Sequence, residues 1–415
     1  MPAADLERRY SARNYEPLPV ELARGQGAYL WDTAGRRYVD MMSAYSAASH
    51  GHSHPRMVAA LTAQAQRLAV PSRAYYNDRL GPFLAELCAL TGLDAAVPMN
   101  TGAEAVETAI KAARRWGYRV KGIPRDRAEI IVAEGNFHGR TTTIVGFSSE
   151  ADYRDGFGPF APGFRAVRFG DLAALERAIT PETAAVLIEP IQGEAGIVAP
   201  PQGWLAGVRR LCDAHDVLLI LDEVQSGLGR TGRWFAFEHE GVRPDGLVLG
   251  KALGGGMLPV SAFVGRHDVM DVFTPGSHGS TFGGNPLAAA VGLEAIRVMH
   301  DEGLVERSRR LGAHMFERLR AMRSSVVREV RGLGLWAGVE IDPRVASARE
   351  ACERLLAKGV LSKETHATVV RLAPPLVIAR DDLDWALDRL EEVLGDLAGA
   401  RPRLAAEERC GDQVW

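Results

Sequence analysis

Short apolar runs that alternate with helical patterns constrain the fold of this chain most strongly. The runs are bounded by glycine or charged residues and lie at 130–133, 184–188, 217–221 and 247–249. Apolar runs of this length are typical of parallel strands buried on both faces. Helical patterns at 103–119 and 205–214 lie between them. We therefore predict a doubly wound α/β domain with a mostly parallel sheet, with functional residues beyond the carboxyl ends of the strands.

Outside this sheet the patterns indicate smaller units. Strand-like alternation at 27–32 precedes it, and strands at 326–341 and a helix at 346–358 follow it. A mixed pattern of this kind is typical of an α+β domain. The predicted organisation is an N-terminal segment packing with the small domain (1–50), a large sheet domain (51–298), a small C-terminal domain (299–399) and a flexible tail (400–415).

The composition argues against several classes of function. A formal net charge of −3 without a basic cluster argues against nucleic-acid binding. Nowhere do about 18 consecutive apolar residues occur, and the N-terminus lacks the apolar core of a signal peptide. The four cysteines lack CxxC spacing, which argues against a zinc site or a disulfide scaffold. We expect a cytoplasmic protein that binds no nucleic acid and no membrane.

Lys251 is unusual in a chain that has only five lysines beside 44 arginines. It follows the apolar run at 247–249 and shortly precedes three consecutive glycines. Arginine stays protonated in proteins, whereas a desolvated lysine can lose its proton and form a Schiff base with an aldehyde. An isolated lysine at a strand end is more often an inert, solvated cation, so the catalytic interpretation depends on its neighbours.

A carboxylate stands at the end of another predicted strand. The run 217–221 ends in Asp222, in line with the point where Lys251 leaves its own strand. A carboxylate beneath a pyridine ring would keep the ring nitrogen protonated and strengthen the ring as an electron sink. Asp222 and Lys251 together predict a pyridoxal phosphate site, although an aspartate after a strand is also often a helix cap or an ion-pair partner.

Two small-residue segments could hold the phosphate of such a cofactor. Residues 97–104 read as strand, turn and helix start, and a helix N-terminus presents free N–H groups to an anion. Hydroxyl and backbone donors gather in the second segment, 279–284. Each signal is weak alone, because threonine often caps helices without a ligand. At the end of another predicted strand, Phe137 could stack on the ring and Arg140 could hold a substrate carboxylate. Alternatively, Phe137 could be a core aromatic and Arg140 a surface cation.

Five motifs in this order resemble class III, fold-type I pyridoxal-phosphate aminotransferases. They are Asn-Thr-Gly-Ala-Glu-Ala (100–105), Phe-His-Gly-Arg (137–140), Asp-Glu-Val-Gln-Ser-Gly (222–227), Gly-Lys-Ala-Leu (250–253) and Gly-Ser-Thr-Phe-Gly-Gly-Asn-Pro (279–286). Stretches at 14–20, 30–32, 156–160, 190–196 and 371–378 look like the ornithine aminotransferase subfamily. The likeness covers residues about 10 to 395, and His138 stands where that subfamily often carries tryptophan.

The resemblance implies a role for several residues around pyridoxal 5'-phosphate. Lys251 would bond to the cofactor's aldehyde and then carry protons, and Asp222 would pair with the pyridine nitrogen. Gln225 would contact the phenolic oxygen, and Phe137 would stack on the ring.

The resemblance also implies how the phosphate is bound. The amides of Gly102 and Ala103 would hold it from within the same chain. In this family Ser280 and Thr281 reach the phosphate of the neighbouring subunit's cofactor. The implied assembly is a homodimer with shared active sites, or a higher oligomer that contains it.

The implied activity transfers the δ-amino group of L-ornithine to 2-oxoglutarate by a ping-pong mechanism, giving glutamate 5-semialdehyde and glutamate. Tyr15 would hold the α-end of ornithine, Tyr45 would shape the pocket, and Arg140 would contact a carboxylate of the acceptor. Glu194 would mask Arg371 while ornithine binds and release it for the extra carboxylate of 2-oxoglutarate. The residues alone leave open that the tyrosines only pack and that Glu194 and Arg371 never meet.

Two alternatives stay open. Another class III ω-aminotransferase would act on acetylornithine or 4-aminobutyrate, and Tyr15 discriminates because an acetylated α-amine would not need it. The chain could also be a non-catalytic scaffold that retains the fold, against which Lys251 and Asp222 argue. The alternating histidines at 50, 52 and 54 lie in a predicted turn without a carboxylate or cysteine cluster, so we predict no metal site.

Overall fold

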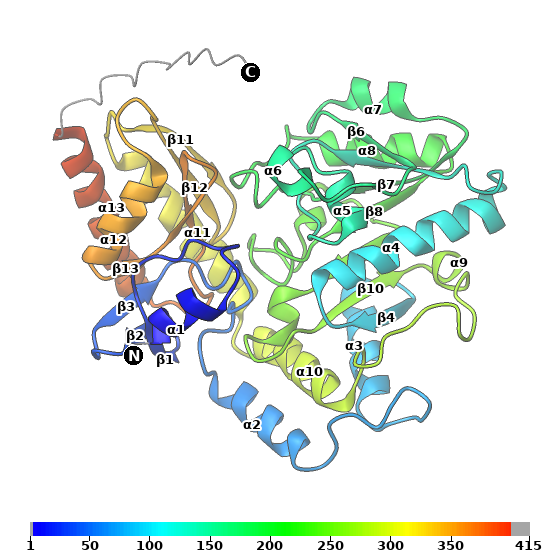
Figure 1. Ribbon diagram of the computed structural model, residues 1–415, viewed down its shortest axis with the longest axis horizontal. Helices are drawn as coiled ribbons and strands as arrows, with labels where there is room; N and C mark the ends of the chain where they lie inside the picture. The colour runs from blue at the N-terminus through cyan, green and yellow to red at the C-terminus, as the bar shows by residue number, and fades with distance from the viewer. Residues whose placement is uncertain (1–2, 400–415) are drawn as a thin grey trace.

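The computed structural model describes residues 3–399, which form two groups of elements (Figure 1). The larger group surrounds a seven-stranded sheet of order β4-β10-β9-β8-β7-β5-β6. Its strands are β4 (Ala95–Met99), β5 (Glu129–Ala133), β6 (Phe164–Val167), β7 (Thr183–Ile188), β8 (Leu218–Asp222), β9 (Gly246–Leu249) and β10 (Ser261–Gly265). β10 pairs antiparallel with both of its neighbours, β4 and β9, and the other strand pairs of this sheet are parallel. The four predicted apolar runs are the adjacent parallel strands β5, β7, β8 and β9, which confirms the predicted α/β fold.

The strands lack polar alternation because both faces of the sheet are covered. In β5, Ile130 and Val132 belong to the core beneath helix α4 (Gly102–Trp116). Ile131 and Ala133 belong to the core on the other face, which includes residues of α8 (Trp204–Ala214) and α10 (Pro286–Asp301). The predicted helices at 103–119 and 205–214 are thus α4, continued by the π-helix η1 (Gly117–Lys121), and α8.

Shorter elements complete the larger group. They are α2 (Pro55–Ala65), α3 (Leu80–Thr91), α5 (Thr142–Gly146), α6 (Ala151–Arg154), α7 (Leu172–Ala178), α9 (His267–Met270) and the 3-10 helices η2 (Ala236–Glu240) and η3 (Lys251–Gly254).

Both ends of the described chain belong to the second group, on the left of Figure 1. Strands β1 (Leu22–Gln26), β2 (Tyr29–Asp32) and β3 (Arg37–Asp40) form a sheet with β13 (Val360–Leu361). The other sheet has the order β11 (Val327–Gly332), β12 (Ala337–Ile341), β15 (Val369–Leu372), β14 (Lys363–Thr365). The helices here are α1 (Ala3–Tyr10), α11 (Leu304–Ala321), α12 (Ala348–Ala357) and α13 (Arg380–Gly399).

The N-terminal strands pair with a strand of the C-terminal part. β3 and β13 are parallel, with Val39 opposite Val360. The large group passes into the second group at Gly303, between α10 and α11. The domain boundaries at 50 and 298 stay predictions, and the predicted flexible tail at 400–415 lies outside the described residues.

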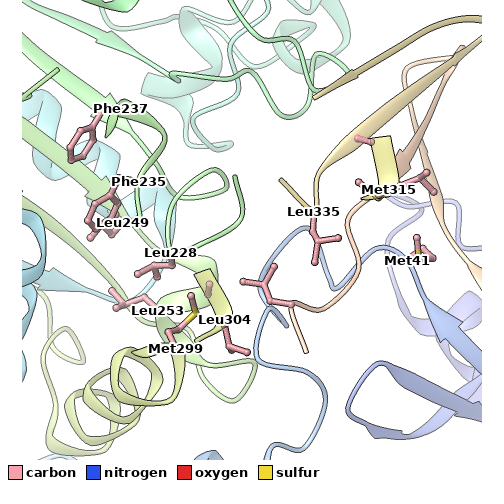
Figure 2. Close-up of a cluster of buried hydrophobic side chains, with 14 of the residues drawn as sticks. Met41, Leu228, Phe235, Phe237, Leu249, Leu253, Met299, Leu304, Met315 and Leu335 are labelled. Carbon is pink, nitrogen blue, oxygen red and sulfur yellow. The ribbon is translucent and has the colours of Figure 1, made fainter. Parts of the chain in front are cut away.

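One apolar core continues between the two groups (Figure 2). Phe235 and Leu249 lie at its large-sheet end, Leu304 lies between, and Leu335 and Met41 lie toward the small sheets. This continuity fixes the loops that meet between the groups, where part of the site is built.

The described residues also show what the helices, cysteines and alternating histidines do in the fold. No helix within residues 3–399 is long and apolar enough to cross a membrane. Cys88, Cys212 and Cys352 are free thiols. The three alternating histidines contact separate partners: His50 with the Ala295 carbonyl at 2.9 Å, His52 with Asp40 at 2.7 Å and His54 with Glu302 at 3.0 Å.

Candidate active site

Two side chains emerge from neighbouring strands of the large sheet. Asp222 is the last residue of β8, and Lys251 follows the end of β9, its parallel neighbour. Both lie at the carboxyl edge, where open α/β sheets bind ligands. They line one cavity of about 180 Å³. Its other lining residues are Gly102, Ala103, Phe137, His138, Gly139, Glu189, Val224 and Gln225.

The Lys251 amine loses its proton more readily than an ordinary lysine. Burial disfavours the ammonium form and lowers the pKa of Lys251, and this outweighs the opposing charge of Glu194. Lys251 also has a left-handed backbone, with a φ of 43°. That conformation is costly for a residue with a Cβ and persists where its surroundings enforce it, often at active sites. The fold therefore holds this amine at the cavity wall.

His138 holds the Asp222 carboxylate in place. The His138 Nδ1 lies 2.7 Å from Asp222 Oδ2, and the Val224 N–H donates to Oδ1 at 3.0 Å. Burial alone would lower the pKa of His138, but the hydrogen bond to Asp222 and its negative charge outweigh burial, so the pKa is raised. The imidazole keeps the buried Asp222 paired and oriented at the cavity.

Glu189 connects two loops of the site. Its carboxylate accepts hydrogen bonds from the Phe137 N–H at 2.9 Å and the Gly193 N–H at 3.0 Å. Burial raises the pKa of Glu189 to about 7. The missing Cβ at Gly193 admits the Gln225 side chain, which would lie 2.7 Å from it. The aromatic wall at Phe137 and the loop that carries Glu194 are thereby fixed to each other.

The N-terminus of α4 forms another wall of the cavity. Thr101 Oγ1 accepts a hydrogen bond from the Glu104 N–H at 3.2 Å, and the Glu104 carboxylate accepts one from the Thr101 N–H at 2.9 Å. This capping box does not use the amides of Gly102 and Ala103, and the first turn of a helix offers them no internal acceptor. These two amides are the donors that an anion in the cavity would meet.

Glu194 and Arg371 form a bidentate ion pair, although 177 positions separate them in the sequence. The Nη1–Oε1 distance is 3.1 Å and the Nη2–Oε2 distance is 3.0 Å. Arg371 is fully buried. Burial alone would raise the pKa of Glu194, but the charge of Arg371 outweighs it and lowers the pKa to about 2.

Gln225 lies between these two charges. Its amide N–H donates to Glu194 Oε1 at 3.1 Å, and its amide oxygen accepts from Arg371 Nη1 at 2.9 Å. Glu194 and Arg371 thus contact both polar atoms of the amide, and the predicted contact of Gln225 with a phenolic oxygen of the cofactor stays a prediction. We call these three residues the Glu194–Gln225–Arg371 cluster.

The three remaining predicted substrate residues, Tyr45, Arg140 and Tyr15, do not line the cavity. Tyr45 faces the cluster, with Arg371 Cζ 4.8 Å from the centre of its ring, a cation–π distance. Arg140 lies over the ring of Tyr153 at 4.0 Å and outside the lining of the cavity. Tyr15 is 80% exposed.

Ser280 and Thr281 do not line the cavity that contains Lys251. Ser280 Oγ accepts a hydrogen bond from Asn100 Nδ2 at 3.0 Å. Thr281 borders a separate surface hollow with residues that include Arg73. The predicted use of both hydroxyl residues by a neighbouring subunit stays a prediction.

Sequence reasoning missed four lining residues, of which two, His138 and Glu189, have titratable side chains. The six residues predicted to hold the cofactor from within one chain all line the cavity: Gly102, Ala103, Phe137, Asp222, Gln225 and Lys251. His138 was noted only as a departure from the subfamily, although it directly follows Phe137 in its motif. Glu189 directly follows β7, so the signal that identified Asp222, a carboxylate at the end of a buried parallel strand, was present there too.

The lining fits pyridoxal phosphate. Lys251 presents an amine to an aldehyde, and Asp222 presents an oriented carboxylate to a ring nitrogen. Phe137 and Val224 give the cavity apolar surfaces for a ring. The Gly102 and Ala103 amides give the phosphate hydrogen-bond donors.

Comparison with known proteins agrees with this chemistry. The sequence matches the family described as Aminotransferase class-III over residues 10–394. It is 55% identical to the ornithine aminotransferase of Bordetella pertussis over 393 residues, 95% of each chain. The structure resembles an ornithine aminotransferase of Toxoplasma gondii, described with partial occupancy of PLP at its active site, with a TM-score of 0.94, 44% identity and coverage of 95% and 94%. It also resembles an acetylornithine aminotransferase of Elizabethkingia anophelis, with a TM-score of 0.87, 44% identity and coverage of 95% and 98%.

Proposed function

Because this chain belongs to the class-III aminotransferase family and is a pyridoxal-phosphate-dependent aminotransferase, we propose that it transfers the δ-amino group of L-ornithine to 2-oxoglutarate. The products are glutamate 5-semialdehyde and glutamate, formed in two half-reactions. The observation that carries the proposal is the Glu194–Gln225–Arg371 cluster, in which a buried cation that could bind a carboxylate is covered by a carboxylate of the protein.

The reacting end of the site performs proton transfer. Pyridoxal phosphate, when bound, supplies an aldehyde that takes up the substrate amine and a ring that stabilises negative charge on the adjacent carbon. Lys251 Nζ, whose lowered pKa makes the neutral amine accessible, would take the proton from the substrate carbon and deliver it to the carbon of the cofactor's aldehyde group. Asp222, oriented by His138, holds a negative charge against the ring nitrogen.

The cluster distinguishes the two substrates. With ornithine bound, Glu194 stays on Arg371 and keeps that cation covered, so the α-carboxylate cannot bind there and the δ-amine is directed to Lys251. 2-Oxoglutarate carries a second carboxylate, which displaces Glu194 and takes the Arg371 fork in a bidentate pair. Positioning, and not the intrinsic reactivity of the two amines, then decides which amine reacts.

Three further residues would hold the parts of the substrate that do not react. Tyr15 would bind the α-end of ornithine, and Tyr45 would shape the pocket from its place on Arg371. Arg140, whose guanidinium contacts only aromatic faces among the described residues, would receive a carboxylate of the acceptor.

The working form would be a homodimer. Ser280 and Thr281 lie away from the Lys251 cavity of their own chain, and their hydroxyls would bind the phosphate in the second subunit. Sedimentation of the holoenzyme tests the assembly, and Thr281→Ala should weaken cofactor binding in a dimer that still forms.

The proposed function is tested by following one nitrogen. The holoenzyme is incubated with 2-oxoglutarate and L-ornithine labelled with 15N at the δ position, and the mass of the glutamate formed is measured. Transfer of the δ-amine gives labelled glutamate, which is the expected result. Unlabelled glutamate would show transfer of the α-amine and contradict the proposal.

Two other amines complete this test. N-acetylornithine and 4-aminobutyrate are supplied separately at the same concentration as ornithine. We expect ornithine to have the highest kcat/KM, and Tyr15→Phe to raise the KM for ornithine more than for 4-aminobutyrate, which has no α-amine. If N-acetylornithine or 4-aminobutyrate has the highest kcat/KM, and Tyr15→Phe leaves it unchanged, that amine is the substrate and the proposal of ornithine is wrong.

A further inference from the structure

Arg230 is a buried cation without a carboxylate partner. Its side chain is 0% exposed, and within residues 3–399 it forms no ion pair; Asp40 acts on it only as a nearby charge. Burial lowers the pKa of Arg230 to about 9, which still leaves the guanidinium charged at neutral pH. A buried charge is costly unless hydrogen bonds satisfy it. The groups that Arg230 binds therefore indicate what this residue does.

Four hydrogen bonds from Arg230 join three segments. Nη1 donates to the carbonyl oxygens of Leu335 at 2.9 Å and Pro374 at 2.6 Å. Nη2 donates to the hydroxyls of Ser43 at 3.1 Å and Ser49 at 2.8 Å. The acceptors lie after β3, between β11 and β12, and after β15, so one guanidinium ties together elements from both ends of the chain.

The two serines flank a strained turn. Ser43, Ala44, Tyr45 and Ser46 have φ values of 45°, 47°, 57° and 75°. Residues with a Cβ disfavour this left-handed region, and a run of four persists only where surrounding contacts enforce it. Ser49 Oγ donates to the Ser46 carbonyl at 2.8 Å and closes the turn from the other side. The conformation that presents Tyr45 therefore depends on contacts outside the turn.

The same network reaches the strand that carries Arg371. Ser43 Oγ donates to the Ala373 carbonyl at 2.7 Å. Ala373 lies two positions after Arg371, just beyond the end of β15. Arg230 thus binds both the turn that presents Tyr45 and the strand end next to Arg371, whose guanidinium faces the Tyr45 ring at 4.8 Å.

We propose that Arg230 is a positioning residue for the choice of amine, which holds Tyr45 against Arg371 and so keeps the Glu194–Gln225–Arg371 cluster closed while ornithine binds. The inference rests on the proposed function, because a closed cluster matters only where two amines compete. Arg230 does not line the Lys251 cavity, so it acts through Tyr45 and not on the reacting atoms.

Arg230→Lys is the direct test. Lysine keeps the charge but cannot reproduce a rigid fork that reaches four acceptors from two nitrogens. With δ-15N-ornithine, we expect the ratio of labelled to unlabelled glutamate to fall about tenfold or more. This ratio compares two amines of one substrate in one enzyme, so a lower amount of folded protein does not change it.

Arg307→Lys is the matched control. Arg307 also donates to backbone carbonyls in the chain after β15, at 3.2 Å to Ile378 from Nε and at 3.3 Å to Val377 from Nη2, but it has no contact with the turn. We expect this variant to lower thermal stability as Arg230→Lys does while leaving the labelled fraction at the wild-type value. Equal loss of the labelled fraction in both variants would reduce Arg230 to a general structural role.

A double-mutant cycle with Tyr45→Ala tests whether Arg230 acts through that ring. If it does, adding Arg230→Lys to Tyr45→Ala changes the labelled fraction no further. Independent, multiplying effects would overturn the proposal. If Arg230→Lys does not fold, Ser43→Ala combined with Ser49→Ala removes the same two acceptors from the turn, and an unchanged labelled fraction in that variant would overturn the proposal equally.

The wild-type measurement keeps the two proposals apart. Unlabelled glutamate from the wild type contradicts the proposed function itself. A labelled wild-type product together with an unchanged ratio in Arg230→Lys supports the proposed function and overturns the role of Arg230.

Discussion

The cavity around Lys251 and the Glu194–Gln225–Arg371 cluster are neighbours, but the fold holds them in different ways. Asp222 ends one strand and Lys251 follows the adjacent strand of a sheet that is buried on both faces. Arg371 lies on β15 of a small sheet and meets Glu194 only because the two groups of elements pack together. In our proposal, bond chemistry therefore depends on residues at the edge of the buried sheet, whereas the choice of amine depends on a contact between the two groups that a substrate carboxylate would replace.

Removing the amine of Lys251 should have the largest effect. Lys251→Ala takes away the group that moves the proton, so we expect kcat to fall about 1000-fold or more while the protein still folds. Steady-state assay with circular dichroism checks both statements. Lys358→Ala is the matched control, because the Lys358 amine pairs with Glu392 on α13, far from the sheet edge. Activity retained by Lys251→Ala would contradict its role.

Removing the charge of Asp222 should have the next largest effect. Asp222→Asn keeps the shape of the side chain but loses the negative charge that faces the cavity and His138, so kcat should fall about 100-fold. Asp245→Asn is the control, since Asp245 is also a buried aspartate but lies before β9, at the opposite edge of the sheet. We expect that variant to lose thermal stability and keep its kcat. Equal losses of kcat would show that the sheet, and not the site, was disturbed.

The pH dependence of the two regions should differ. The pKa of Glu194 lies at about 2, below the ordinary value of 4.5. A carboxylate with a depressed pKa contributes its stabilisation above the ordinary value and loses it as the pH falls toward the depressed one. The labelled fraction from δ-15N-ornithine should therefore stay constant from about pH 5.5 to 9. The overall rate should vary over this range, because proton transfer depends on neutral Lys251. A labelled fraction that changes between pH 6 and 8 would contradict the closed ion pair.

The sequence identifies the cavity around Lys251 well, because the residues that indicate it lie directly beside the strands in the sequence. Apolar runs mark the strands, and a residue directly after a strand lies at the sheet edge whatever the rest of the chain does. Asp222 and Lys251 could be paired on that ground alone. The same reasoning applies to Glu189, which directly follows β7, although Glu189 is not among the predicted site residues.

The Glu194–Gln225–Arg371 cluster is only partly predictable, because its contacts join residues that are far apart in the sequence. Nothing local in the sequence indicates that Gln225 bridges Glu194 and Arg371, or that four residues from Ser43 take left-handed backbone angles. The role of Arg230 depends on three segments that meet only in the folded protein. Family resemblance supplied the pairing of Glu194 with Arg371, and the structure supplied the contacts that hold it.

The most direct test of whether the Glu194–Gln225–Arg371 cluster selects the amine is Glu194→Ala with δ-15N-ornithine and 2-oxoglutarate. Removing Glu194 uncovers Arg371 for the α-carboxylate of ornithine, which brings the α-amine to Lys251. We predict that unlabelled glutamate becomes a major product while the rate of amine transfer stays within about tenfold of the wild type. Glutamate that remains fully labelled would show that the cluster does not select the amine and would contradict the account.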